Sequence, residues 1–407
     1  MATSPDFWDH PYYRLVKLLA TVTGTWPRQS LKEIIMYRFA IFVVVVIQVT
    51  PQIVAFWKYR DNMEIILETI SPFIIDLALT VKFMNAWWFF KRSTYLLEQI
   101  RENWNIFPRN NGRYMLHYHS EFARKLSLVY LAGVYMAGIV FSTEPLQQRA
   151  LSLLLHTNIT APNRFSMPMD FGSINLDVWY YPLFLMSGVC IIIIITVIGS
   201  CDLMFLMYAE HACGLFKGLG YAIIHLPPHD PKDRVDYGFE YMRKCAIIHR
   251  RVIDFAEDIK DIFMWSFLGI IGLNMIIISV TAVQVMINLK SMEKIVKFIL
   301  FVSMQMVHLF VECFVAQRLM DASFELTESL TNANWYNASR KTQRLIPIML
   351  MRSQNPIILT AGKIIVMNMN TYAVQRRSAL ETRDDQQKSG SSSLSINGLE
   401  SIYVPIG

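Results

Sequence analysis

The stretch from Tyr180 to Leu206 reads YYPLFLMSGVCIIIIITVIGSCDLMFL and carries a single charged residue, Asp202, near its end. A helix needs about 20 mostly apolar residues to cross the hydrocarbon core of a bilayer. We therefore predict that these residues form a membrane-spanning helix, with the isoleucine run from Ile191 to Ile195 near its centre.

Further stretches of the chain have the same apolar character and length. Residues 345–375 form a weaker candidate, because the polar segment Arg352–Pro356 interrupts it and Lys363 lies within it. We predict an all-α polytopic membrane bundle with six clear spans and a partial seventh. Besides Tyr180–Leu206, the clear spans are Ile34–Trp57, Ile65–Phe90, Leu126–Phe141, Ile262–Asn288 and Phe298–Gln317.

The composition of the 407-residue chain agrees with this prediction. Hydrophobic residues make up 53% of it and charged residues 17%, and the mean hydropathy is +0.32. Soluble domains carry about 25% charged residues, so an ordinary cytosolic enzyme, a disordered protein and a secreted disulfide scaffold are all disfavoured. The sequence also lacks a phosphate-binding glycine loop and a histidine–glutamate zinc motif. We expect no catalytic residues, no cofactor, no metal and no nucleic-acid partner.

Basic residues are unevenly divided between alternate loops. The N-terminal segment and the loops on its side of the membrane carry 24 Lys and Arg residues, against 7 in the remaining loops. Because basic loops stay in the cytoplasm, the N-terminus is predicted to be cytosolic. G-protein-coupled receptors have the opposite orientation and are disfavoured. None of the five cysteines falls in a predicted outer loop, so no extracellular disulfide is expected.

Residues 237–261 are predicted to form an amphipathic helix that leads into the fifth span. Apolar side chains recur there every three or four positions, and a soluble helix with such a stripe needs a partner that covers it. This chain's own cytosolic extensions of spans four and six cover the stripe, or a neighbouring subunit does, or both do. The stripe includes Phe239, Met242, Ile248, Val252, Phe255 and Ile259.

Four ionisable residues lie at membrane depth: Asp76 and Lys82 in span two, Asp202 in span four and Glu312 in span six. Such groups are costly when they face lipid, so each is predicted to face protein or water. Their role is either hydrogen bonding between helices, which contributes about 1 kcal/mol in comparable systems, or the lining of a polar cavity or ion path.

A series of motifs in the last third of the chain resembles the ordered signature of insect odorant receptors. The likeness in layout extends over about residues 10–375, with a long outer loop after span three and a long inner loop after span four. The inner loop lacks the long insertion of the shared co-receptor, so the resemblance is to a ligand-tuned member. The motifs are Cys313–Gln317 (CFVAQ), Asn334–Tyr336 (NWY), Arg344–Pro356 (RLIPIMLMRSQNP), Thr360–Lys363 (TAGK) and Asn368–Tyr372 (NMNTY).

The resemblance implies a ligand-binding subunit of an odorant-gated, non-selective cation channel. The resemblance implies four subunits around one pore, in which a tuned receptor works with the odorant co-receptor. It also implies a location in the plasma membrane of sensory neuron dendrites. Subunit contacts concentrate in a cytosolic anchor, which on this chain would include Phe239–Ile262 and Leu345–Lys363. The ligand would be a small volatile apolar molecule, and gating would follow from its different contacts in the closed and open states.

The chain departs from the family's pattern after Tyr372. There the family continues with an apolar pore-lining helix, whereas this chain has Gln375-Arg376-Arg377 and a tail rich in Ser and Gly. We therefore predict a receptor-like transmembrane domain over residues 1–375 and a polar, disordered tail over residues 376–407. The expected consequences are an incomplete pore helix and a cytosolic C-terminus.

The ligand site is predicted in the outer half of the bundle. Volatile apolar ligands need a concave, mostly apolar site, and aromatic rings and methionines supply adaptable contact area. Generic helix packing is the alternative role for each residue, so they are predicted as a set: Phe73, Tyr135, Met136, Ile139, Tyr181, Phe184, Phe301 and Met304.

Other classes of membrane protein remain open at this point. A gustatory-type receptor of the same superfamily is disfavoured by the C-terminal motifs. A transporter would often show internal repeats and paired broken helices, whereas this chain shows no repeat between its halves. Odour-evoked cation current on co-expression with the co-receptor separates a channel from a transporter.

The predicted orientation can be tested by sugar attachment. The sequon Asn158-Ile159-Thr160 falls outside and the sequon Asn337-Ala338-Ser339 falls inside, so glycosidase treatment should shift the mobility of the wild type but not of Asn158→Gln. The matched variant Asn337→Gln should behave as the wild type does. Natural glycosylation at Asn337 with Asn158 bare would invert the molecule.

Overall fold

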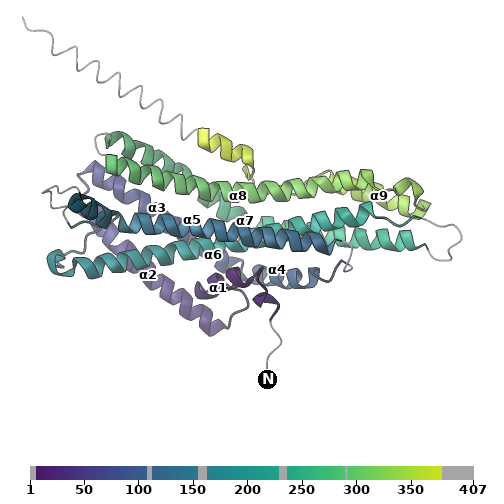
Figure 1. Cartoon of the computed structure of the whole chain (residues 1–407), viewed down its shortest axis with the longest axis horizontal. Coiled ribbons are helices and arrows are strands. Elements are labelled where there is room, and N and C mark those ends of the chain that lie inside the picture. Colours follow the sequence, from purple (N-terminus) through teal and green to yellow (C-terminus); the bar gives the residue numbers. More distant parts are fainter. Residues whose placement is uncertain (1–5, 108–111, 155–162, 229–235, 289–291, 378–407) are drawn as a thin grey trace, which may run out of the picture.

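The computed structural model describes residues 6–107, 112–154, 163–228, 236–288 and 292–377, and they form a helical bundle with one small β-hairpin (Figure 1). A helical segment at 369–377 follows the hairpin. The predicted all-α membrane bundle is confirmed. The elements are η1 (Phe7–Asp9), α1 (Arg14–Val22), α2 (Leu31–Lys58), α3 (Met63–Trp88), α4 (Phe90–Asn103), α5 (Arg113–Leu154), α6 (Leu176–Ile224), α7 (Tyr237–Ile287), α8 (Met292–Asn332), η2 (Trp335–Asn337), α9 (Arg340–Ser353), β1 (Thr360–Ala361) and β2 (Ile365–Val366).

Side-chain caps define where several helices begin. Ser30 and Glu33 form a reciprocal capping box at the start of α2, and Asn62 accepts hydrogen bonds from the first turn of α3. Asn175 and Asp236 cap α6 and α7 in the same way. Each cap satisfies backbone N–H groups that have no partner inside the helix.

Four helices are much longer than a bilayer requires. α6 and α7 have 49 and 51 residues, and α5 and α8 have 42 and 41. At 1.5 Å per residue they measure roughly 60–77 Å, about twice the 30 Å hydrocarbon core. Figure 1 shows them side by side along the long axis, with α2 and α3 at one end and α9 at the other. The bundle therefore has a membrane-sized end and an extension beyond it.

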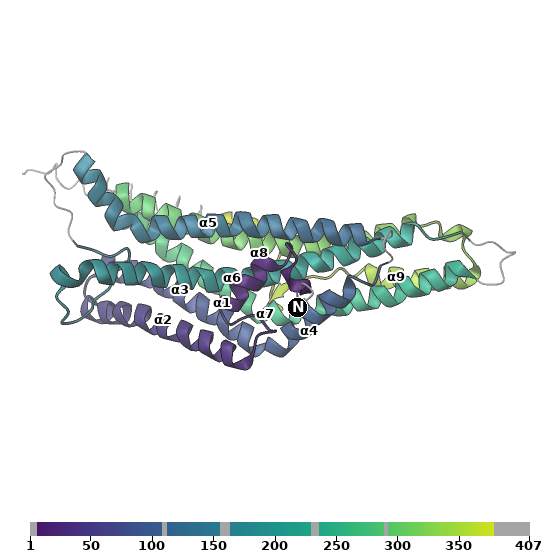
Figure 2. The same cartoon turned by 60° about the horizontal axis from the view of Figure 1, so that its bottom comes forward.

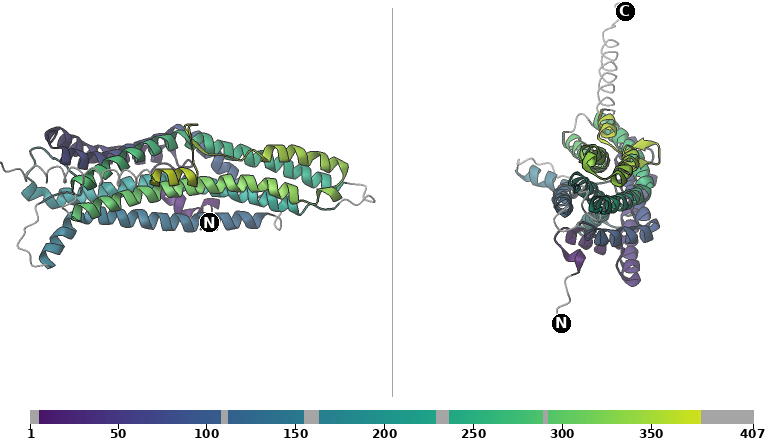
Figure 3. Two further views of the ribbon diagram at one scale, coloured as in Figure 1. Left: turned by 90° about the horizontal axis from the view of Figure 1, so that it is seen from above. Right: turned by 90° about the vertical axis from the view of Figure 1, so that its right-hand side faces the viewer.

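α6 is the central helix of the bundle. It packs against α1, α2, α3, α5, α7 and α8, and nearly every residue from Asp202 to Leu219 is buried. Figure 2 shows α1 and α4 against the middle of the bundle, and the end-on view in Figure 3 shows the helices gathered around one axis. A helix that is apolar on all sides needs such a central position.

Within the described part of the chain, five helices are long and apolar enough to cross a membrane: α2, the part of α5 from Arg113 to Gln147, α6, α7 and the part of α8 from Ile295 to Asn332. They correspond to five of the six predicted clear spans. α3 corresponds to the sixth, but it carries Glu68, Asp76 and Lys82 and is not among these five. That α3 also crosses the membrane stays a prediction.

The weaker candidate at 345–375 is interrupted where the sequence predicts. α9 ends at Ser353, and the chain then forms the antiparallel pair β1–β2. Its turn contains Gly362 and Lys363, both with positive φ, and a Cβ at Gly362 would lie 2.6 Å from a Leu268 methyl group. The Gly362 N–H donates to the Met264 carbonyl at 3.0 Å, so the hairpin is fixed on α7.

The predicted amphipathic helix is the first half of α7. Met242, Val252, Phe255 and Ile259 are fully buried within this one chain. The ring of Phe255 lies 5.6 Å from that of His211 on α6. The chain's own helices therefore cover most of the stripe, while Phe239 and Ile248 are half-buried. A role of the stripe as a subunit anchor stays a prediction.

The loop before α6 is fixed to the end of α2 by polar contacts. The Asp170 carboxylate lies 2.6 Å from the Lys58 ammonium, and its backbone N–H donates to the Pro51 carbonyl at 3.1 Å. Burial of Asp170 alone would raise the pKa of its carboxyl, but the Lys58 hydrogen bond and charge, with the Gly172 N–H, lower that pKa below its ordinary value of 3.8.

The Lys58–Asp170 pair predicts a pH dependence of stability. A carboxyl whose pKa is lower in the folded state stabilises the protein above its unfolded pKa, and this contribution disappears as the pH falls through the lowered value. Asp170→Asn should therefore unfold at a slightly lower temperature than the wild type near neutral pH, and the difference should begin to shrink as the pH falls below about 4. The effect is small because solvent screens the half-exposed Lys58.

Thermal unfolding in detergent, followed by tryptophan fluorescence between pH 3 and 7, measures this difference. Asp177→Asn provides a control, because the structure gives the Asp177 side chain no ion pair among the described residues. A difference between Asp170→Asn and the wild type that grows toward low pH would contradict the assignment.

Candidate functional site

A cavity of about 780 Å³ lies between α3, α5, α6, α7 and α8. Its walls come from the second half of α5 and α7 and from the first half of α6 and α8. These segments belong to the half of the bundle that the sequence assigns to the outside. The apolar lining includes Pro72, Ile75, Ala78, Val134, Ala137, Ile191, Ile194, Ile195, Ile198, Ile270, Ile277, Leu300 and Val307.

The local sequence explains why this wall is apolar and close-fitting. Ile191, Ile194, Ile195 and Ile198 follow helical spacing, so they share one face of α6. α5 approaches that face at Gly138, where a Cβ would lie 2.6 Å from Ile195. A larger residue at position 138 would push the two helices apart.

The loop before α6 also contributes to the cavity wall. Met167 lines the cavity, and its sulfur accepts hydrogen bonds from the Gln48 and Gln52 amides of α2 at 3.2 and 3.4 Å. The contacts of Asp170 with Lys58 and Pro51 hold the same loop in place. The cavity wall therefore includes a segment that the sequence reads only as an outer loop.

Three of the predicted ligand residues line the cavity: Met136, Phe301 and Met304. Phe301 lies with its ring 6.1 Å from that of Phe141, another wall residue. Tyr135 is half-buried outside the lining, and its hydroxyl lies 2.9 Å from the Thr196 hydroxyl of α6. Tyr135 thus joins α5 to α6 beside the cavity.

The other four predicted residues lie away from the lining. Phe184 packs against Tyr180, with ring centroids 5.8 Å apart. Phe73, Ile139 and Tyr181 are 40%, 49% and 66% exposed. On a membrane-sized bundle such exposed apolar side chains fit contact with lipid. The structure therefore brings together part of the predicted set, on α5 and α8.

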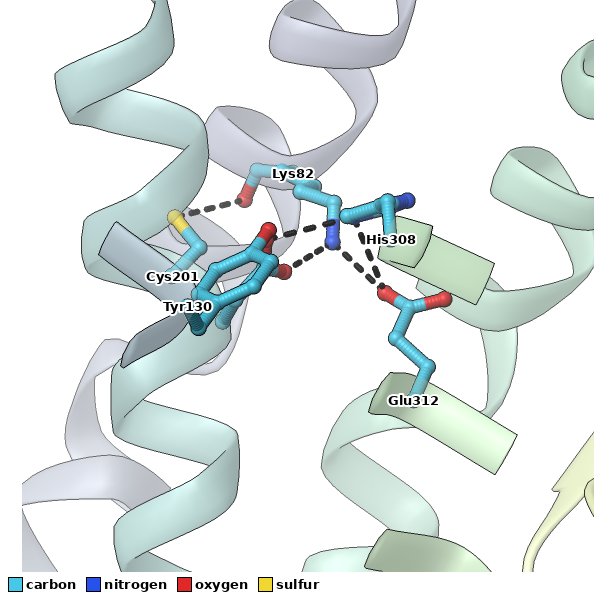
Figure 4. A network of polar contacts seen from close by, with 6 residues as sticks. Lys82, Tyr130, Cys201, His308 and Glu312 are labelled. Carbon is cyan, nitrogen blue, oxygen red and sulfur yellow. Dashed lines mark hydrogen bonds and ion pairs between the residues drawn. The ribbon is translucent and has the colours of Figure 1, made fainter. Parts of the chain in front are cut away.

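A buried charged network forms the floor of the cavity (Figure 4). Lys82 of α3 donates hydrogen bonds to Asp202 of α6 and, at 2.7 Å, to Glu312 of α8. Tyr130 of α5 donates to the other Asp202 oxygen at 2.6 Å. His308 lies 3.2 Å from Asp202 and 3.6 Å from Glu312. We call these five residues the charged floor.

The charged floor joins four helices at one level. Lys82, Tyr130 and His308 line the cavity above, whereas Lys82, Asp202 and Glu312 line a smaller cavity of about 40 Å³ on the other side. Lys82, Asp202 and Glu312 are each at least 94% buried. Removal of one partner would leave an uncompensated buried charge.

Three of the four ionisable residues predicted to avoid lipid thus meet in this network. Tyr130 and His308 were not predicted from the sequence. His308 precedes Glu312 by four residues on α8, so the two share a helix face, and that spacing is a signal for His308. Nothing in the sequence near Tyr130 indicates its contact with α6.

A second buried polar group lies further along the bundle, outside the cavity. Glu210 of α6 accepts hydrogen bonds from Arg318 of α8 and lies 2.8 Å from His119 of α5. The Arg318 guanidinium also lies 4.1 Å from the centre of the Phe122 ring. His119, Glu210 and Cys213 are close enough to ligate a metal, as are Asp202, His308 and Glu312. In each group, however, Arg318 or Lys82 already supplies a cation to the carboxylates.

Relatives of similar length are odorant receptors. Odorant receptor 9a of Drosophila melanogaster is 23% identical over 341 residues, covering 81% of this chain and 83% of that protein. Odorant receptor 22c of the same species is 22% identical over 374 residues, covering 86% and 90%. These relatives are odorant receptors and not enzymes.

Solved structures show the same fold. The insect olfactory receptor OR5 from Machilis hrabei, in complex with eugenol, superposes with a TM-score of 0.72 at 14% identity, covering 92% of this chain and 97% of that one. Another structure of that receptor gives 0.66 at 12% identity, with 90% and 95% covered. A family model for the 7tm odorant receptors matches residues 62–378. The chain therefore belongs to the odorant receptor family and is a multi-pass protein of the plasma membrane.

Proposed function

We propose that this chain is the ligand-binding subunit of a heteromeric, odorant-gated cation channel in olfactory sensory neurons. The observation that carries the proposal is the cavity of about 780 Å³ in an odorant receptor chain, between the outer halves of five helices. Small-molecule sites measure about 300–1,000 Å³ and are mostly apolar. The cavity has the size and the lining of such a site.

The ligand class follows from the cavity wall. Isoleucine side chains, Phe301 and the flexible Met136 and Met304 provide apolar contact without a fixed shape. A small volatile molecule with a hydrocarbon skeleton fits such a wall. The relative solved with eugenol binds a molecule of this size class.

The partner proposed for this chain is the odorant co-receptor. With a cytosolic N-terminus, the extensions of α6–α8 and α9 lie in the cytoplasm. Apolar side chains are exposed on this extension at Ile247 of α7 and at Ile348 and Met351 of α9, each at least 60% accessible. Outside lipid, exposed apolar side chains on neighbouring helices favour contact with another subunit. The anchor is therefore proposed at these exposed positions, beside the stripe that is already buried.

The pore-lining helix of the family would continue after Tyr372 in this chain. The segment at 369–377 is helical, and the polar tail predicted from the sequence continues into residues 378–407, which lie outside the described residues. Asn158 lies outside them as well. The subunit ratio and the path of ions are properties of the assembled channel.

The charged floor provides a route from ligand to channel. A ligand shifts a conformational equilibrium only if it contacts the two states differently. Lys82, Tyr130 and His308 face the cavity and also hold α3, α5, α6 and α8 together. A molecule that fills the cavity therefore contacts these helices on the outer side of the charged floor, where all four are joined.

The cavity assignment predicts which side chains set the preference among odorants. Phe301→Ala and Met304→Ala should change the rank order of odorants in currents recorded with the co-receptor, because both remove part of the wall. Both side chains are half-buried at the cavity wall, so each truncation removes contact area for a bound ligand. Phe73→Ala, at an exposed position on α3, is the matched control and should keep the wild-type order. The reverse pattern would exclude this cavity as the odorant site.

The charged floor predicts a specific pattern of loss and rescue. Lys82→Met should strongly reduce surface expression, because it leaves Asp202 and Glu312 buried without their cation, at a cost of about 3–5 kcal/mol. The triple variant Lys82→Met, Asp202→Asn and Glu312→Gln should restore expression, since no charge remains uncompensated.

Currents from the triple variant should stay small relative to its surface expression, because the helices are no longer tied at one level. Surface biotinylation and odour-evoked current, measured on the same cells, test both parts. Wild-type surface levels for Lys82→Met would show that the network does not hold the bundle together.

A further inference from the structure

Two polar side chains interrupt the apolar wall of the cavity at one height. Asp76 on α3 and Asn274 on α7 both line the cavity, and they are 6% and 3% exposed. The two helices run antiparallel. Val81 of α3 lies against Gly269 of α7, and Gln284 of α7 donates to the Leu67 carbonyl of α3. Asp76 precedes Val81 by five residues and Asn274 follows Gly269 by five, so the register places them opposite each other.

Asp76 differs from the other ionisable residues of the cavity in its partners. Lys82 and His308 belong to the charged floor. Glu144 pairs with Arg164, and Lys297 lies 2.8 Å from Glu68. Asp76 accepts one hydrogen bond, from the neutral Gln52 amide at 2.9 Å. Among the described residues it has no cationic partner, and its second oxygen accepts no hydrogen bond.

Asn274 carries a hydrogen-bond donor without a partner, whereas Asp76 carries an acceptor without one. Its side-chain nitrogen is buried and has no hydrogen-bond partner among the described residues. A buried amide without a partner costs about 1–3 kcal/mol, and buried polar groups in proteins are nearly always paired. The wall therefore presents an acceptor on α3 and, on α7, an amide whose N–H group is unpaired in the protein. A half-turn about the last side-chain bond, a torsion that is broad and roughly two-fold in asparagine, brings that N–H group to the cavity.

We propose that Asp76 and Asn274 bind the hydroxyl group of an alcohol odorant. A hydroxyl donates one hydrogen bond, which fits the carboxylate, and accepts another, which fits the amide. An ether or ester can only accept, and a protonated amine can only donate. The inference rests on the proposed function and narrows its ligand class from small apolar molecules to alcohols.

The position of the pair also orients the ligand. Asp76 precedes Lys82 by six residues on α3, about 9 Å along the helix axis, so the hydroxyl lies above the charged floor and not within it. The hydrocarbon part is left to pack against the isoleucines of α6 and against Phe301 and Met304 of α8. The polar end of such a molecule then lies at Asp76 and Asn274, and its hydrocarbon end lies at the apolar wall.

The experiment compares matched odorants on the receptor co-expressed with the co-receptor. The panel contains the straight-chain primary alcohols from butanol to decanol and benzyl alcohol, each with the methyl ether, the primary amine and the hydrocarbon of the same skeleton. Alcohols are expected to activate at concentrations at least about tenfold lower than their methyl ethers, the size of one hydrogen bond to a charged group. Asp76→Asn and Asn274→Leu should each reduce that ratio toward one.

Met304→Leu is the control, because it changes the same wall without a polar group and should shift alcohol and ether alike. Surface biotinylation normalises every current, and the near-isosteric Asp76→Asn keeps the shape of the wall. Equal potency of alcohols and ethers, a preference for amines, or an unchanged ratio in both variants would overturn the inference while the receptor still responds. Silence toward every odorant at normal surface expression would contradict the proposed function itself.

Discussion

The arrangement of the helices depends on one buried ammonium group. Lys82 of α3 lies between carboxylates of α6 and α8, and all three side chains are almost completely buried. A buried charge without its partner is costly, so α3 cannot separate from α6 and α8 without a large penalty. This constraint sets the height of α3 against the central helix. The cavity above the network then follows from the apolar side chains that these helices bring to the same level.

The sequence predicts the spans well, because the physical requirement is simple. α6 needs only an apolar stretch of sufficient length, and Tyr180–Leu206 supplies it. The cost of buried charge also correctly predicts that Lys82, Asp202 and Glu312 avoid lipid. Which of them meet depends on helix register, which is a tertiary property. Asp76 and Lys82 are both single ionisable residues in the same apolar stretch, yet only Lys82 has charged partners.

The ligand residues are harder to predict for a related reason. A helix that is apolar on every side has no periodic pattern that distinguishes its lipid-facing side from its cavity-facing side. Phe73 and Phe301 are both aromatic residues in the predicted outer half, but Phe73 is exposed and Phe301 lines the cavity. The stripe of α7 is different, since polar residues alternate with apolar ones there, and its buried positions follow the prediction. Sequence periodicity is informative where the surroundings include water.

The charged floor and the apolar wall respond differently to a bound molecule. At an effective dielectric constant near 20, moving two charges apart by about 1 Å costs roughly 1–2 kcal/mol. This equals the exposure of about 60 Å² of apolar surface. Met136 is already 61% exposed, so a rotation of its side chain exposes little further surface. Rearranging the apolar wall therefore costs less free energy than separating the charges of the floor.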